Sequence, residues 1–397
     1  MEYPPVKTIR LTLIAACLLL CIAANAQTAA HDWNKLADGM VAALVNNFWG
    51  ASFKDTPDRF FFNKMSQQAD MATNDYWPQA HAIDVITDAY LRTRDKKYLT
   101  IFDQWFEGVP RFNRSKRAED PWWKVYVDDM EWVVLAQIRI YEATGKTLFL
   151  NKARQMYADW IWTQWSPEPE APFHGGITWK TDIEPSKNAC SNAPAAIIAA
   201  RLAQFADIDK EHDRKSREEY IAEAVRIVSW MQAHLYNAEN GEVYDNMKKD
   251  GSIRKAAFTY NQGTFLGACH ELFRLTGNRE YLQTATKAAE FIIKYKTTNN
   301  GALTDSERGD GALFHGIFFR YLVKLALDPA VDAELQEQYK TYLVRLAAIL
   351  ADKGLNHETM LYGGRWHEPS PVGKPSSLNA HVTGCMLMEA VCLLYKK

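Results

Sequence analysis

The hydrophobic pattern of the chain is helical almost throughout. Apolar residues recur at three- and four-residue intervals over twelve segments, whereas the period-two alternation that is typical of strands is weak. The segments differ in character: 147–164 is amphipathic, with Trp160 in its apolar stripe, but 191–206 has no polar residue between Ala193 and Ala200. The pattern predicts helices at 32–49, 78–93, 97–107, 128–144, 147–164, 191–206, 214–235, 258–276, 279–296, 311–328, 332–352 and 377–395.

Amphipathic helices alternate along the chain with helices that are apolar on almost every side. A helix without a polar face must be buried all round, so the apolar helices form an inner ring and the amphipathic helices cover it. Short turns such as Gly145-Lys146 and Gly277-Asn278 follow inner helices, and long loops precede them. We therefore predict an all-α fold, an (α/α)6 barrel of six inner and six outer helices, as a single domain over residues 27–397.

The long loops and the N-termini of the inner helices meet at one end of such a barrel. Polar or glycine-rich runs stand where the inner helices begin, and loop residues on a rigid scaffold commonly build a binding site. Core packing remains an alternative for each aromatic residue in these runs, and a core ion pair remains one for the acid. We predict substrate contacts from Trp77, Gln79, Asp84, Trp123, Tyr126, Trp179, Asn192, Tyr260 and Gln262.

Two adjacent carboxylates, Asp128 and Asp129, lie among aromatic residues at the start of the predicted helix 128–144. A glycosidase needs one carboxyl group to protonate the leaving oxygen and another to attack the anomeric carbon or to activate water. A helix N-terminus stabilises an ionised nucleophile, and repulsion within the pair raises the proton affinity of one acid. Alternatively, Asp128 is only a helix N-cap with Glu131 as its capping-box partner, which leaves Asp129 without a role. We predict that the two aspartates are the catalytic pair.

Composition disfavours several classes of function. The formal net charge is −2, with 46 basic and 48 acidic residues, so the chain carries no electrostatic footprint for nucleic acid or an anionic membrane. The sequence has no Walker A loop, no G-x-S-x-G and no H-E-x-x-H or similar histidine spacing, so we predict no cofactor and no metal site. Four cysteines follow the N-terminal region without C-x-x-C spacing, and we predict buried core positions for Cys190, Cys269, Cys385 and Cys392.

The N-terminus has the features of a secretory signal. A basic start precedes an apolar run over 11–22, and Ala24-Asn25-Ala26 is a small-residue cleavage site. The apolar run is shorter than the roughly 20 residues that a membrane span needs. We therefore predict a signal peptide over residues 1–26 and an exported monomer, periplasmic or extracellular, without an integral membrane span. Lipidation at Cys17 is the less favoured alternative.

Six runs, in order along the chain, resemble glycoside hydrolase family 76, the bacterial endo-α-1,6-mannanases that are related to fungal cell-wall mannosidases. The resemblance implies an (α/α)6 barrel and a retaining mechanism on α-1,6-linked mannan or manno-oligosaccharide, with Asp128 as nucleophile and Asp129 as acid/base. His315 stands where that family pattern would have a lysine. The runs are Trp77-x-Gln79-Ala-x-x-Ile-Asp84, Tyr126-x-Asp128-Asp129-x-x-Trp132, Gly175-Gly176-Ile-x-Trp179, Lys187-Asn188-Ala-x-x-Asn192, Thr259-Tyr260-Asn261-Gln262-Gly263 and Gly316-Ile-Phe-x-Arg320-Tyr321.

Two other classes of function remain open from the sequence. Another (α/α)6 carbohydrate enzyme, either a transglycosylase or an unsaturated uronyl hydrolase, would share the fold, but the near-neutral charge disfavours a uronate substrate. A non-catalytic glycan-binding protein can also be helical and rich in aromatic residues, but it has no need of paired acids. The sequence therefore favours a secreted retaining endo-α-1,6-mannanase.

Overall fold

The computed structural model describes residues 31–50, 59–63, 65, 76–113, 115, 117, 119–166, 174–182, 185–374 and 376–396. The predicted signal peptide at residues 1–26, together with Cys17, lies outside these ranges. Within them, no helix is both long and apolar enough to cross a membrane.

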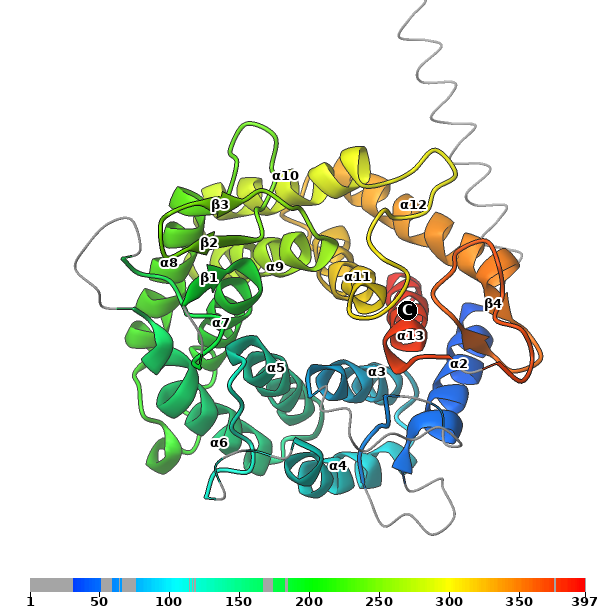
Figure 1. Ribbon diagram of the computed structural model, residues 1–397, viewed down its shortest axis with the longest axis horizontal. Helices are drawn as coiled ribbons and strands as arrows, with labels where there is room; N and C mark the ends of the chain where they lie inside the picture. Colours follow the sequence, from blue (N-terminus) through cyan, green and yellow to red (C-terminus); the bar gives the residue numbers. More distant parts are fainter. Residues whose placement is uncertain are drawn as a thin grey trace, which may run out of the picture.

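Two concentric rings of helices make up the described fold, which confirms the predicted (α/α)6 barrel (Figure 1). The inner ring closes on itself, because its last helix packs against its first. Its members are α3 (Trp77–Thr93), α5 (Val127–Thr144), α7 (Ala189–Leu202), α9 (Thr259–Thr276), α11 (Gly311–Leu327) and α13 (Leu378–Leu394). The outer ring consists of α2 (Trp33–Phe48), α4 (Lys97–Asn113), α6 (Thr147–Met156), α8 (Arg217–His234), α10 (Arg279–Tyr295) and α12 (Ala333–Ile349).

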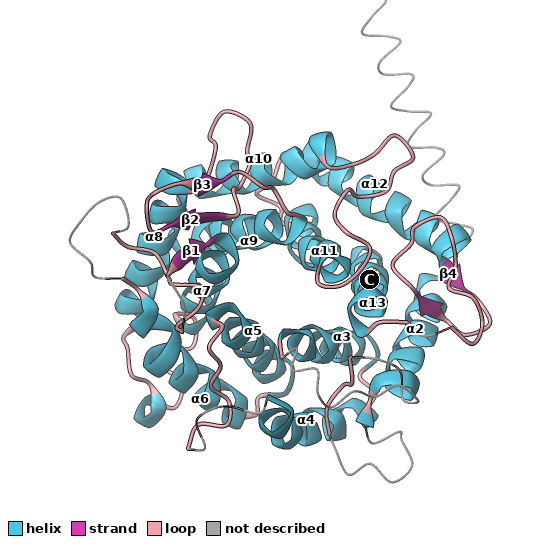
Figure 2. Cartoon of the chain, in the orientation of Figure 1, coloured by secondary structure: helices cyan, strands magenta, loops and turns pink. Residues whose placement is uncertain are grey.

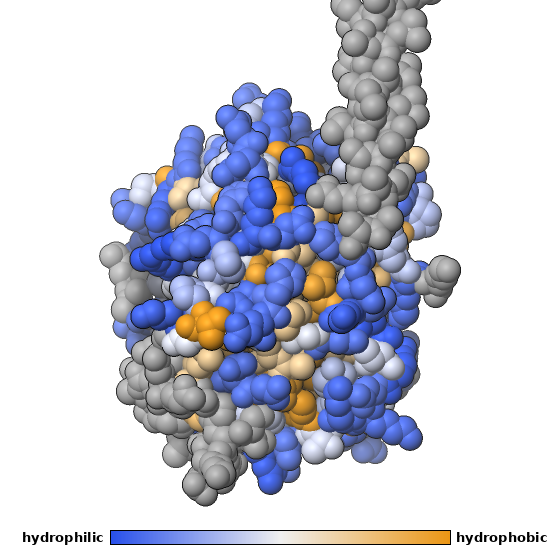
Figure 3. All heavy atoms as spheres, turned by 90° about the vertical axis from the view of Figure 1, so that its right-hand side faces the viewer, coloured by the Kyte–Doolittle hydropathy of each residue, from blue (hydrophilic) through white to orange (hydrophobic). Residues whose placement is uncertain are grey.

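Burial separates the two rings as the apolar pattern predicts. Almost the whole of α7 is buried, whereas the outer helices keep a polar face. Figure 3 shows mainly hydrophilic atoms, with scattered apolar patches, on the face that is turned to the viewer. Short turns close the C-terminal ends of inner helices: Gly145 and Gly277 each adopt a φ of 73°, a left-handed conformation that glycine tolerates and that ends a helix.

Two helix boundaries differ from the prediction by more than three residues. The helix predicted at 97–107 continues as α4 to Asn113, although Gly108 and Pro110 both disfavour a helix interior. Tertiary packing overrides this preference at Gly108. The backbone of Arg59 lies so close to the helix there that a Cβ atom would be only 2.2 Å from its carbonyl oxygen, so glycine fits and a larger residue does not. The helix predicted at 191–206 ends at Leu202 and is followed by turns. Three residues before its predicted end, the 332–352 helix changes into a π-helical turn, η6 (Leu350–Gly354).

The helix predicted at 147–164 is continuous in position but changes its geometry. It leaves the α conformation after Met156 and continues as a π-helical turn, η3 (Tyr157–Ile161), and a 3-10 turn, η4 (Trp162–Gln164). π turns are rare and often lie near functional sites. The apolar period alone does not distinguish these forms.

Short strands organise the long loops at the N-terminal end of the inner ring (Figure 2). β1 (Ser186–Asn188), β2 (Asn246–Lys248) and β3 (Ile253–Arg254) form an antiparallel sheet in the order β1-β2-β3, with Lys187 opposite Met247. β4 (Leu355–Asn356) pairs with β5 (Leu361–Tyr362). Strands of two or three residues are too short to give a period-two pattern, so the sequence could not predict them. They fix the loops that precede α7, α9 and α13.

A buried layer of ion pairs joins the inner helices nearer their C-terminal ends. Arg139 of α5 lies 2.9 Å from the Asp84 carboxylate of α3 and also pairs with Asp88. Arg320 of α11 lies 3.2 Å from Asp88, and Lys324 lies 3.2 Å from a carboxylate of α9. Each charge therefore has an opposite charge close by, which offsets part of the cost of burial.

Candidate active site

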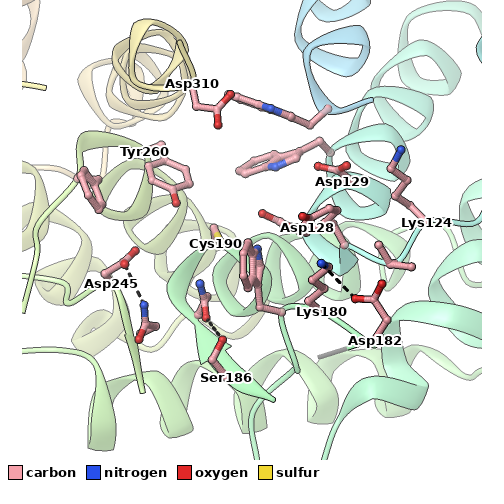
Figure 4. A pocket seen from close by; sticks show the side chains of 18 of the residues that line it. Lys124, Asp128, Asp129, Lys180, Asp182, Ser186, Cys190, Asp245, Tyr260 and Asp310 are labelled. Carbon is pink, nitrogen blue, oxygen red and sulfur yellow. Dashed lines mark hydrogen bonds and ion pairs between the residues drawn. The ribbon is translucent and has the colours of Figure 1, made fainter. Parts of the chain in front are cut away.

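A pocket of about 830 Å³ opens at the end of the barrel where the long loops meet (Figure 4). Residues from the first turns of the inner helices and from the loops above them form its wall. Asp128 and Asp129 of α5 lie within it, and five predicted binding residues line it: Trp77, Trp123, Tyr126, Trp179 and Tyr260.

The two aspartates occupy the first turn of α5 without capping it. The helix begins at Val127, its N-cap residue is Tyr126, and no side chain makes a cap hydrogen bond there. The interpretation of Asp128 as an N-cap with a capping-box partner is therefore wrong. The backbone N–H of Val127 instead donates to the carbonyl oxygen of Trp179 at 2.9 Å, which ties the start of α5 to the loop that carries this indole.

Burial dominates the electrostatics of Asp128. Desolvation raises the pKa of its carboxyl group to about 6, because the charged form loses its contact with water. The Cys190 thiol and the Trp179 side chain donate hydrogen bonds to the carboxylate and lower the pKa against this effect. At neutral pH the carboxyl group is therefore mostly ionised. Asp129 is 9% exposed, and its charge contributes to the raised pKa of Tyr76.

A third carboxyl group, Glu131, lies behind the pair, one helical turn after Asp128. It is fully buried, and neither oxygen has a hydrogen-bond partner in the described part of the chain. Desolvation, and next the charge of Asp128, raise the pKa of Glu131 well above its ordinary value. Burial therefore favours the neutral form of the Glu131 carboxyl group. The sequence pattern D-x-x-E points instead to a capping role, which the structure does not give it.

Aromatic rings cover two sides of the pocket. The rings of Tyr126 and Trp179 lie 5.3 Å apart, and Lys180 sits 4.6 Å above the Tyr126 ring. On another side, Tyr260 of α9 stacks on Phe314 of α11 with ring centroids 3.9 Å apart and 16° between the planes. Such rigid faces suit the apolar C–H faces of sugar rings.

Four predicted binding residues do not line this pocket. The Gln79 amide accepts a hydrogen bond from the backbone N–H of Phe61 at 2.9 Å and donates to the carbonyl oxygen of the same residue. Asn192 holds Ile177 in the same two-sided way, at 2.7 and 3.1 Å, and so fixes the loop that leads to Trp179. Our assignment of these two amides to substrate contact is therefore corrected: each clamps a loop through backbone groups.

The other two residues lie deeper in the barrel. Asp84 belongs to the ion-pair layer with Arg139 and Arg320, so the alternative of a core ion pair holds and a direct contact in the pocket does not. Gln262 is fully buried, and its amide has no partner among the described residues. An apolar helix face carries no sign of whether its few polar residues point up into a pocket or across to a neighbouring helix.

The structure also brings polar residues into the pocket that we did not select from the sequence. Asp310 precedes α11 and faces the aspartate pair in Figure 4. Burial raises its pKa, and the Trp77 side chain donates a hydrogen bond that lowers it. Asp245 accepts hydrogen bonds from Arg254 at 3.0 Å and Asn261 at 3.2 Å. The sequence could have indicated Asp310, because it begins a polar run at the start of an inner helix. It could not have indicated Asp245, because the short β sheet brings this residue to the pocket.

Residues 22–396 match Glycosyl hydrolase family 76. The chain belongs to glycosyl hydrolase family 76. A solved member, the α-1,6-mannanase GH76A of Salegentibacter sp. HEL1_6, is 33% identical with a TM-score of 0.79, over 91% of this chain and all of that chain. An inactive variant of that protein, in which two adjacent aspartates are replaced by asparagine, has been solved in complex with α-1,6-mannotriose.

Fungal proteins are similar over a shorter stretch. Mannan endo-1,6-alpha-mannosidase DCW1 of Candida glabrata is 32% identical over 201 residues, which are 47% of this chain and 42% of that protein. The protein of the same name from Saccharomyces cerevisiae is 25% identical over 222 residues, 47% of its length. This chain therefore spans less than half the length of the fungal relatives it matches. Family 76 membership rests on the match over almost the whole chain.

Proposed function

We propose that the protein is a secreted, retaining endo-α-1,6-mannanase. The observation that carries the proposal is the position of Asp128 and Asp129, the only adjacent aspartates in the chain, inside an aromatic pocket at the start of a buried helix of a family 76 barrel. A solved relative that is inactive when two adjacent aspartates become asparagine, and that holds α-1,6-mannotriose, supports the same chemistry and substrate.

The two carboxyl groups would act in two steps. Asp128, ionised above a pKa of about 6, attacks the anomeric carbon while Asp129 protonates the departing glycosidic oxygen. A glycosyl ester on Asp128 results. Asp129, now a carboxylate, then takes a proton from water, and the water oxygen displaces Asp128. Because the N-terminus of α5 carries a partial positive charge, it stabilises Asp128 each time the carboxylate is free.

The pocket suits a neutral polysaccharide that extends past the pair on both sides. Stacked rings at Tyr260 and Phe314, and tilted rings at Tyr126 and Trp179, offer separate surfaces for sugar rings. The wall also carries five aspartates, with three Lys or Arg residues, so a substrate rich in uronate carboxylates would be repelled. This charge balance disfavours an unsaturated uronyl hydrolase. Export is proposed from residues 1–26, with a periplasmic or extracellular destination.

Incubation with unbranched α-1,6-mannan tests this function. We expect a falling chain length from the first minutes and a ladder of manno-oligosaccharides by size-exclusion chromatography, because an endo enzyme cuts within the backbone. β-1,4-mannan, which presents the other anomeric configuration, is the matched control and should stay intact. Release of mannose alone would contradict endo action, and an unchanged α-1,6-mannan would contradict the proposed function.

A further inference from the structure

Cys190 occupies an unusual place for a buried cysteine. It is the second residue of α7, it is 2% exposed, and it lines the pocket beside Asp128 (Figure 4). The other three cysteines of the described chain, Cys269, Cys385 and Cys392, do not line this pocket. Our sequence-based prediction placed all four in the apolar core. That prediction is right about burial and wrong about the surroundings of Cys190.

The thiol stands between two polar groups from neighbouring helices. It lies between the Asp128 carboxylate of α5 and the hydroxyl group of Tyr260 on α9, and all three side chains line the pocket (Figure 4). Tyr260 is itself held in place, because its ring stacks on Phe314. Cys190 and these neighbours lie on the first turns of four consecutive inner helices, α5, α7, α9 and α11. A change of side chain at position 190 would therefore act on Asp128 directly.

We propose that Cys190 is a positioning residue for the reaction: its thiol donates a hydrogen bond to Asp128, orients that carboxylate and favours its ionised form. This inference rests on the proposed function, since it concerns the proposed nucleophile. The thiol suits the task because it stays neutral. Burial, and next the charges of Asp128 and Asp245, raise the pKa of Cys190 well above its ordinary value, so it donates its proton in a hydrogen bond without adding a charge.

The other titratable groups around Asp128 are present both in wild type and in the Cys190 variants, so a difference between their pH profiles follows from the change at position 190. They come from every element that surrounds the carboxylate. These groups are Asp129 and Glu131 on α5, Tyr260 on α9, Asp310 before α11, and Asp245 and Lys180 in the loops.

The pH dependence of kcat/KM on α-1,6-mannotetraose tests the role of the thiol in wild type, Cys190→Ala and Cys190→Ser. The acid limb reports the ionisation of Asp128 in the free enzyme, and activity falls as the pH drops through about 6. The Cys190→Ala variant lacks this donor to the carboxylate. The acid limb of its pH profile should therefore move to higher pH by on the order of one pH unit. The Cys190→Ser variant has a hydroxyl group, which is a stronger donor than a thiol. Its acid limb should therefore lie at the same pH as that of wild type or at a lower pH.

Cys269→Ala is the matched control, because this buried cysteine of α9 does not line the pocket and its removal should leave the limb in place. If the acid limbs of wild type and of both folded Cys190 variants lay at the same pH, Cys190 would have only a packing role. Absence of α-1,6 hydrolysis in wild type at any pH would instead overturn the proposed function.

A second measurement needs neither activity nor a folded Cys190 variant. The S–H stretching band in the infrared moves to lower frequency when the thiol donates a hydrogen bond. We expect one of the cysteine bands of wild type to shift to higher frequency in Asp128→Asn, because a neutral amide oxygen accepts more weakly than a carboxylate. Identical bands in the two proteins would overturn the assignment of Cys190 as a donor to Asp128.

Discussion

Replacement of either aspartate of the pair by asparagine should abolish nearly all hydrolysis, a loss on the order of 10³-fold or more in kcat. Asn at position 128 cannot form the glycosyl ester, and Asn at position 129 cannot protonate the leaving oxygen. The double variant should lose little more than the worse single variant, because nucleophile and acid act as one unit. Initial rates on α-1,6-mannan, with enzyme concentration raised for the variants, measure these losses.

The fold should survive the change at Asp128. The pKa of its carboxyl group in the folded chain, about 6, lies above the ordinary aspartate value, so ionisation of this group opposes folding. Its stabilising contribution is full below about pH 3.9 and is lost as the pH rises through about 6. Asparagine does not ionise, so Asp128→Asn should melt at or above the wild-type temperature at pH 7.

Asp103→Asn is a matched control, because this aspartate lies on the outer helix α4, 53% exposed, and pairs with Lys146 far from the pocket. It should keep wild-type activity. A folded Asp128→Asn or Asp129→Asn variant with more than a tenth of wild-type activity would exclude that residue from catalysis.

Removal of the central cation of the buried ion layer should cost far more stability than removal of a surface cation. Arg139→Met leaves Asp84 and Asp88 with Arg320 as their nearest opposite charge, and the Asp84 side chain is only 6% exposed. Loss of one partner from a buried pair costs about 3–5 kcal/mol, because the remaining charge stays desolvated. Urea unfolding at pH 7 measures the difference in free energy.

Lys146→Met removes a cation of similar length from an exposed pair with Asp103, and it should cost no more than about 1 kcal/mol. The folded fraction of Arg139→Met should retain activity, since Arg139 does not line the pocket. Equal stabilities of the two methionine variants would show that the buried layer contributes little to the fold.

The barrel follows from the sequence because burial and periodicity are properties of whole helices. A run such as Ala193 to Ala200, without a polar side chain, has to be enclosed, and six such helices alternating with amphipathic ones leave little choice of architecture. The same reasoning places inner-helix starts at one end. We therefore predicted that the aspartate pair and rings such as Trp77 and Tyr260 would meet there, and these four residues line the pocket.

Side-chain direction is what the sequence could not supply. Gln79 and Asn192 lie in the first turns of inner helices, as Trp77 does, yet their amides turn to the backbone of Phe61 and Ile177. Asp84 lies on the same helix as Trp77, about two turns further on, which is far enough to place it in the ion layer. Cys190 was grouped with the core cysteines because it lies in an apolar helical stretch without C-x-x-C spacing, and only the approach of α5 and α9 reveals its polar neighbours.

Proton NMR of α-1,6-mannotetraose hydrolysis in its first minutes tests directly whether the aspartate pair of α5 carries out retaining cleavage of α-1,6-mannosidic bonds. One spectrum series reads the linkage that is cut and the configuration of the new reducing end before mutarotation mixes the anomers. We expect the α anomer to appear first, through the glycosyl ester on Asp128. Initial appearance of the β anomer would contradict it, and a carboxylate farther from the pair, with Asp310 across the pocket as the first candidate, would then have to take one of the two roles.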